Sequence, residues 1–211
     1  MVQQPSAQNY LNHIDLFCMH DRYSALIQPA KLWSRAEVLE HGSSVPKSAG
    51  IYAWYFRNVP SAIPTDDCLT CQGLTLLYAG ISPSKPAGNR TLKERIRKHL
   101  TSNAYGSTLR LSLGCLLGEE LGIELRRVGN SGTRLTFSAT GEQKLNHWLD
   151  SNAFVTWMLH GAPWEVEPEL LKTVSFPLNL DHNEHHPFQS KLATLRAEAK
   201  ARARLLPVVP E

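Results

Sequence analysis

Apolar and polar positions follow two different periods along this chain. Apolar runs of strand length lie at 50–56 and 74–81, and both are rich in aromatic and branched residues. A segment with several proline, aspartate and glycine breakers separates them over 58–73. We therefore expect two strands that pair as an antiparallel hairpin with a long connecting loop.

Shorter runs indicate further strands later in the chain. The segments 123–128 and 134–138 flank Gly129-Asn130-Ser131-Gly132, which is typical of a second hairpin. An apolar run over 153–158 predicts one more strand.

Apolar residues also recur at helical spacing. Thr91 is a suitable N-cap for a helix that ends near Leu100, with an apolar stripe on one side. Arg95 and His99 are four residues apart, so both should project from one face of this helix. Other helices are expected at 9–19, 35–41, 107–117, 142–150 and 188–205, and one more helix, whose start is bracketed by Pro163 and Pro168, should run to about Val174.

This alternation predicts an α/β fold of the α+β kind. We expect a small, mostly antiparallel sheet of about three core strands, flanked by helices, with an inserted hairpin and helix. The 211 residues, 42% of them hydrophobic, are enough for one core. The chain should therefore comprise an N-terminal helical extension (1–47), a main domain (48–187) with an insertion around 103–161, and a basic C-terminal helix (188–211) packed on or near it.

Charge and targeting signals narrow the class of protein only slightly. The formal net charge of +3 permits a polyanionic partner without requiring one. The chain has no basic start followed by an apolar run, and no stretch of roughly twenty apolar residues that could span a membrane. We expect a cytoplasmic protein that does not associate with membranes.

The four cysteines are too few for a disulfide scaffold in a chain of this length. Cys68 and Cys71 have metal-ligand spacing, but one such pair is half of a tetrahedral zinc site. We expect surface thiols in the hairpin loop rather than zinc ligands. Residues that could complete a zinc site are Cys18, His20, Cys115, His182, His185 and His186.

Residues suited to phosphodiester hydrolysis occur in a suggestive order. This reaction needs an activated water, a cation beside the phosphate and a carboxylate that can hold a divalent metal. The chain offers Gly50-Ile51-Tyr52 on one strand, Tyr78-Ala79-Gly80 on the next, Arg95 and His99 on a helix, and later Glu167 and Asn179. In this order the motifs resemble those of the GIY-YIG nuclease family.

The resemblance covers roughly 48–183 and implies a metal-dependent endonuclease acting on DNA. It implies that Tyr78 is the general base and that Tyr52 positions the water, although the reverse assignment is open. Arg95 would stabilise the phosphate, and His99 would contact phosphate or relay protons. Glu167 would hold one Mg²⁺ or Mn²⁺ ion, and Asn179 would fix the geometry.

Several alternatives remain open on the sequence alone. Pro168 predicts that Glu167 lies at or just before the first helical turn, so Glu165 or Glu169 could replace it as the ligand. The protein could also be a non-catalytic nucleic-acid-binding protein of the same fold, a thiol or zinc regulatory protein, or a homodimer. The expected contacts to the DNA backbone are Lys93, Arg97 and Lys98, and the C-terminal helix could add Lys191, Arg196, Lys200, Arg202 and Arg204.

Overall fold

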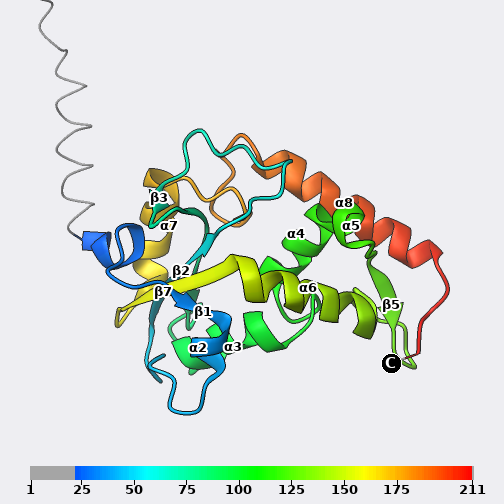
Figure 1. Ribbon diagram of the computed structural model, residues 1–211, viewed down its shortest axis with the longest axis horizontal. Helices are drawn as coiled ribbons and strands as arrows, with labels where there is room; N and C mark the ends of the chain where they lie inside the picture. The colour runs from blue at the N-terminus through cyan, green and yellow to red at the C-terminus, as the bar shows by residue number, and fades with distance from the viewer. Residues whose placement is uncertain (1–21, 211) are drawn as a thin grey trace, which may run out of the picture.

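The computed structural model describes residues 22–210, and its centre is a five-stranded antiparallel sheet (Figure 1). The strand order is β1-β7-β2-β4-β3. The helix predicted at 9–19 lies outside the described residues. The strands of this sheet are β1 (Trp33–Ser34), β2 (Gly50–Phe56), β3 (Thr70–Cys71), β4 (Leu74–Ser82) and β7 (Ala153–Leu159).

The predicted α+β class and the antiparallel hairpin of β2 and β4 are confirmed. The sheet is larger than the predicted core of about three strands. Its three long strands, β7, β2 and β4, form the core, and β1 and β3 extend the two edges with two residues each. Strands this short show no alternation in the sequence, which is why the pattern missed them.

Helices cover both faces of the sheet (Figure 1). On one face, Tyr52, Trp54 and Phe56 of β2 belong to a core that includes residues of α3, α4 and α6. On the other face, alternate β2 residues pack with residues of α7 and of the helical turn at 22–27. The helices are α2 (Arg35–Leu39), α3 (Leu92–Thr101), α4 (Thr108–Leu116), α5 (Gly118–Leu121), α6 (Ser138–Asn152), α7 (Pro163–Thr173) and α8 (Gln189–Leu205).

An irregularity in β4 orients the second predicted motif. Trp54 is opposite Tyr78 but Tyr55 is opposite Leu76, so Leu77 is an extra residue in β4. Such bulges re-aim the side chains beside them. Here Leu77 and Tyr78 both join the core on the face that carries Tyr52.

The C-terminal helix α8 lies along the outside of α4 and continues toward the small hairpin (Figure 1). The hairpin consists of β5 (Arg126–Val128) and β6 (Arg134–Thr136). Beyond α8 the chain returns to this hairpin, where Val209 N–H donates to the Arg127 carbonyl and Val209 accepts from Gly129 N–H. The end of the chain is therefore tied to the segment between β4 and β7.

Beneath the sheet, α4 and α6 are joined by a buried ion pair. The fully buried Arg110 donates from both Nε and Nη2 to Glu142 Oε2, at 3.1 and 2.6 Å. Glu142 Oε1 accepts from the backbone amides of Ala104 and Phe137. Arg110 also donates to the His99 carbonyl at 3.4 Å, so this network supports the C-terminal end of α3.

Candidate active site

A cleft of about 550 Å³ opens beside β4, beyond the point where β3 ends. Most of the predicted site residues line it: Tyr52, Tyr78, Arg95, Glu167 and Asn179. These side chains come from β2, β4, α3, α7 and the segment after α7, and folding brings them together across more than one hundred residues of chain. His99 lies behind them, almost fully buried.

Gly50 and Gly80, the glycines of the two strand motifs, lie where another residue comes too close for a side chain to fit. A Cβ atom at Gly50 would fall on the carbonyl oxygen of Met158, because β7 runs directly alongside. At Gly80 it would fall on the hydroxyl of Tyr52, which lies on the paired strand. Glycine at these positions therefore allows β7 to pack on β2 and lets the Tyr52 ring lie across β4.

A continuous hydrogen-bonded chain begins at the Tyr52 hydroxyl. This hydroxyl lies 2.8 Å from His99 Nε2, and His99 Nδ1 lies 2.7 Å from Ser107 Oγ. Burial, with the nearby positive charges of Arg95, Arg110 and Lys98, holds the pKa of His99 well below its usual value. The ring is therefore neutral, and its Nε2 can accept the Tyr52 proton when Nδ1 carries hydrogen toward Ser107.

The guanidinium of Arg95 interacts with both tyrosine hydroxyls. Its Nε donates to the Tyr52 hydroxyl at 3.3 Å. Burial lowers the pKa of Arg95, but the hydroxyls of Tyr52 and Tyr78 raise it overall, so the guanidinium stays charged. Burial also raises the pKa of Tyr52 far above its usual value, which keeps that hydroxyl protonated.

Tyr78 is the more open of the two tyrosines. Its ring centroid lies 6.4 Å from that of Tyr52. Its hydroxyl is 3.5 Å from Thr108 Oγ1, a long contact to a group that is not a base. The Tyr78 hydroxyl also interacts with the Arg95 guanidinium, but within residues 22–210 it forms no hydrogen bond to a base as Tyr52 does to His99.

Glu167 supplies a carboxylate to the cleft. The prediction that it lies at or just before the first turn of its helix was wrong. Helix α7 begins at Pro163, so Glu167 lies in the second turn and Pro168 lies inside the helix. Pro163 provides the proline at the first helical position that the sequence had assigned to Pro168. Of the alternative ligands, Glu165 is exposed and Glu169 forms a 2.9 Å ion pair with Arg22; neither lines the cleft.

The Glu167 carboxylate suits a hard divalent ion. Burial raises its pKa, and the neighbouring groups act on it through charge alone: His182 and Arg95 lower the pKa while Asp181 raises it. A half-buried carboxylate without hydrogen-bond donors is costly unless a cation binds it. No group of three or more histidine, cysteine, aspartate or glutamate side chains in the described part of the chain could enclose a metal. Mg²⁺ needs only one or two carboxylates, with waters and phosphate oxygens completing its shell.

Asn179 has a positioning role at the edge of β4. Its side chain accepts from Ala79 N–H at 3.0 Å and donates to the Ala79 carbonyl at 2.8 Å. The amide therefore satisfies the outer edge of β4 where β3 no longer reaches it. It fixes the strand between Tyr78 and Gly80 and holds the segment that follows α7 against the cleft.

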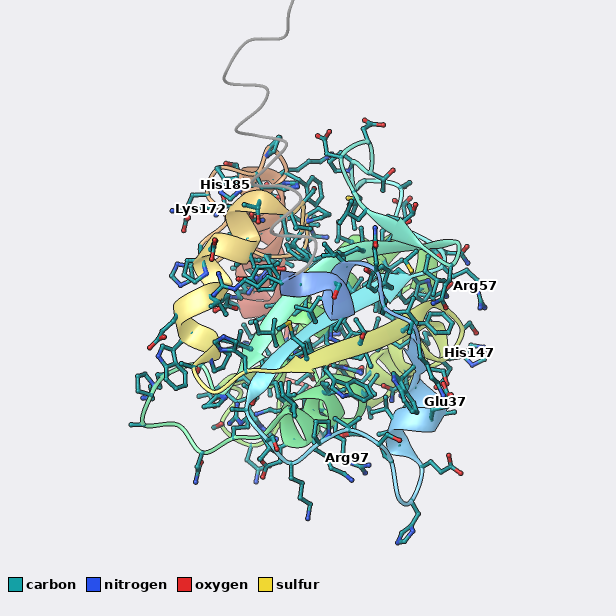
Figure 2. All side chains as sticks on the ribbon, turned by 90° about the vertical axis from the view of Figure 1, so that its left-hand side faces the viewer. Glu37, Arg57, Arg97, His147, Lys172 and His185 are labelled. Carbon is teal, nitrogen blue, oxygen red and sulfur yellow. The ribbon has the colours of Figure 1, made fainter. Side chains whose placement is uncertain are left out.

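The three predicted backbone contacts on α3 lie outside the cleft. Lys93 donates to the Ser43 carbonyl at 3.5 Å, and Arg97 and Lys98 do not line the cleft either. Figure 2 shows Arg97 pointing outward, at the opposite edge of the molecule from Lys172 of α7.

The cleft instead holds cations that the sequence analysis did not single out or did not place. Lys85 and Arg90 come from the loop between β4 and α3, and Arg196 comes from α8. Ser82 Oγ closes that loop by donating to the carbonyls of Arg90 and Thr91. Asp181 and His182, of which the sequence analysis named only His182 and only as a candidate zinc ligand, line the cleft as well. The sequence signal for Arg90 was its position directly before Thr91, the N-cap of α3.

The thiols of Cys68 and Cys71 contact different parts of the chain. Cys68 Sγ lies near Pro64 and Ser175, and Cys71 Sγ lies near Pro29. Cys18 and His20 lie outside the described residues. Within residues 22–210, no helix is both long and apolar enough to cross a membrane.

Comparison with known protein families agrees with this geometry. The family profile for the GIY-YIG catalytic domain matches residues 50–198, which is more than half of the chain. The chain belongs to the GIY-YIG family. The match begins at Gly50, spans every element that lines the cleft, and ends within α8. Searches of curated proteins and of solved structures found no match.

Proposed function

We propose that this GIY-YIG protein is a metal-dependent endonuclease that hydrolyses phosphodiester bonds in DNA. The observation that carries the proposal is the convergence of Tyr52, Tyr78, Arg95 and Glu167 on one cleft. A polyanionic substrate fits the additional cations Lys85, Arg90 and Arg196 in the same cleft.

In this mechanism the scissile phosphate lies beside Arg95. Its guanidinium offers paired donors to the phosphate oxygens and offsets the charge that develops in the transition state. Glu167 would hold the divalent metal, which supplies Lewis-acid stabilisation of the phosphoryl oxygens when bound. Lys85 and Arg90 would bind the backbone beyond the reacting group.

The contacts favour Tyr52 as the group that carries the proton away from the attacking water. A neutral tyrosine can accept a proton only if it gives up its own, and the Tyr52 hydroxyl is bonded to neutral His99. A phosphate beside Arg95 would offset part of the positive potential that lowers the pKa of His99. Tyr78, which lacks such an acceptor, would orient the water.

Cleavage of supercoiled plasmid and of a branched oligonucleotide, with Mg²⁺ and with EDTA, tests the function. We expect metal-dependent nicking by the wild type and none by Glu167→Ala. Glu165→Ala and Glu169→Ala are matched controls from the same helix and should cut normally. If neither the wild type nor the controls cut, but all shift the DNA on a gel, the protein is a non-catalytic DNA-binding member of the family.

The proton path has its own test. Tyr52→Phe should lower kcat by about 10²–10⁴-fold, the usual range for loss of a general base. Tyr78→Phe should have a smaller effect. The opposite ranking would assign the base to Tyr78.

A further inference from the structure

We propose that Arg196 of α8 binds a backbone phosphate next to the scissile one, so that the C-terminal helix forms one end of the substrate path. This inference rests on the proposed nuclease function and extends it to a residue outside the motifs that resemble those of the family. Its substrate group is a phosphodiester of the cleaved strand.

The packing of α8 brings Arg196 to the cleft. Leu192 and Ala203 are fully buried, which fixes α8 against α4. The same helix α4 carries Thr108, whose hydroxyl contacts Tyr78. Of the five cations of α8 only Arg196 lines the cleft; Lys191, Lys200, Arg202 and Arg204 do not, and Lys191 and Arg204 are exposed.

Arg196 has a charge but no counterion of its own. No ion pair or hydrogen bond from its guanidinium is formed within residues 22–210, although Cys115, Asp181 and Tyr78 act on it electrostatically. Its side chain is partly withdrawn from water. An arginine in this setting gains from an anion that can accept two parallel hydrogen bonds, as a phosphate does.

The cations of the cleft come from elements that adjoin different points of β4. Arg196 interacts with Tyr78, whereas Lys85 and Arg90 belong to the loop that starts after Ser82. Four residues of strand span about 13 Å. One DNA strand advances roughly 3.4 Å along the axis per nucleotide, so this length accommodates several consecutive phosphates. Arg95 would then hold the scissile phosphate, with Arg196 on one side of it and Arg90 on the other.

The test replaces single phosphates of the cleaved oligonucleotide by neutral methylphosphonates, one position at a time. Binding is measured by fluorescence anisotropy in a Glu167→Gln background, so that no cleavage occurs. The proteins compared carry Arg196→Gln, or Arg204→Gln as a charge-matched control from the same helix. Arg196→Lys is included because it keeps the charge and supports folding if Arg196→Gln does not.

We expect Arg196→Gln to weaken binding by about tenfold and to reduce the salt dependence by about one phosphate contact. One methylphosphonate on one flank should weaken the parent protein and Arg204→Gln but leave Arg196→Gln unaffected. Arg196→Lys should keep part of the affinity. In the cleaving protein, Arg196→Gln should raise KM more than it lowers kcat.

Three results would overturn the proposal. Arg196→Gln could match Arg204→Gln in affinity and salt dependence, it could lose sensitivity only at the scissile phosphate, or it could lower kcat with KM unchanged. Failure of the wild type to cut with Mg²⁺ is a separate result, because it overturns the nuclease function while the binding measurements still decide the role of Arg196.

Discussion

Arg110 beneath the sheet and the cleft residues Arg95 and Arg196 are all partly or fully buried, but their surroundings differ. Arg110 is fully buried and donates hydrogen bonds to Glu142, Asn146 and the His99 carbonyl. Arg95 and Arg196 lie at the cleft and form no ion pair with any carboxylate in residues 22–210. A buried cation that is fully paired fixes a structure, whereas one left without a counterion is available to an anionic ligand.

The carboxylates of the two regions, Glu142 and Glu167, differ in the same way. Glu142 accepts hydrogen bonds from Arg110 and from two backbone amides. Helix α7 places Glu167 at the cleft, where its carboxylate forms no hydrogen bond or ion pair within residues 22–210 and is influenced only by the charges of His182, Asp181 and Arg95. The two regions meet at His99, whose side chain bonds Tyr52 and whose carbonyl accepts from Arg110. Stability and activity should therefore respond to different substitutions.

The largest expected effect is on stability, from Arg110→Met. Removing Arg110 leaves the Glu142 charge buried without its partner, which costs about 3–5 kcal/mol. The double variant Arg110→Met/Glu142→Gln should recover part of the loss, because glutamine removes the charge and keeps an acceptor for the amides of Ala104 and Phe137. The measurement is the free energy of unfolding in urea.

The control for Arg110 is an exposed ion pair. Arg22→Met breaks the 2.9 Å contact with Glu169, in which both side chains are about half exposed (48% and 50%). Its cost should be below about 1 kcal/mol. Equal costs for the two substitutions would contradict the role given to Arg110.

The next effect is on catalysis, from Arg95→Gln. Loss of a fixed donor to the transition state lowers kcat by about 10²–10³-fold. Folding stability should change little, because Arg95 forms no ion pair with a carboxylate within residues 22–210. Arg97→Gln, on the outward side of the same helix, is the matched control and should retain activity. A large loss of folding stability in Arg95→Gln would contradict the different roles given to Arg95 and Arg110.

The lowered pKa of His99 predicts how the free energy of unfolding depends on pH. Because burial lowers the pKa of His99 in the folded state, the unfolded chain binds a proton near pH 6.5 that the folded protein does not. The contribution of neutral His99 to the free energy of unfolding is therefore fully present above that pH. It is lost as the pH falls below that value, by at most about 1.4 kcal/mol per pH unit. His99→Gln should be less stable at pH 7 but should show a flatter decline between pH 6.5 and 5 in urea unfolding.

The smallest effect is expected for Glu167→Gln without added metal. Burial raises the pKa of Glu167, so the folded protein keeps this proton to a higher pH than the unfolded chain does. Stability then declines as the pH rises from about 4.5 through the folded-state pKa. Glu167→Gln should be more stable than the wild type at pH 7, within roughly 1 kcal/mol. The difference, measured by urea unfolding, should vanish below about pH 4.5.

The local elements of this protein could be predicted from its sequence. The strand at Gly50–Phe56, the N-cap at Thr91 and the helix that carries Arg95 and His99 depend on residues close together in the chain. The order of the motifs was also sufficient to indicate the GIY-YIG family. Local periodicity and capping contain this information because each involves only a few neighbouring residues.

What only the tertiary structure decided depends on contacts between distant segments. The bulge at Leu77, the ion pair of Arg110 with Glu142 and the pairing of Asn179 with Ala79 join segments that no periodicity connects. The start of α7 at Pro163 placed Glu167 within the helix. Packing of α8 on α4 put Arg196 at the cleft, while the orientation of α3 turned Arg97 away from it. A basic residue in a sequence shows only that a cation is present; whether that cation is paired, exposed or directed at a substrate depends on the packing around it.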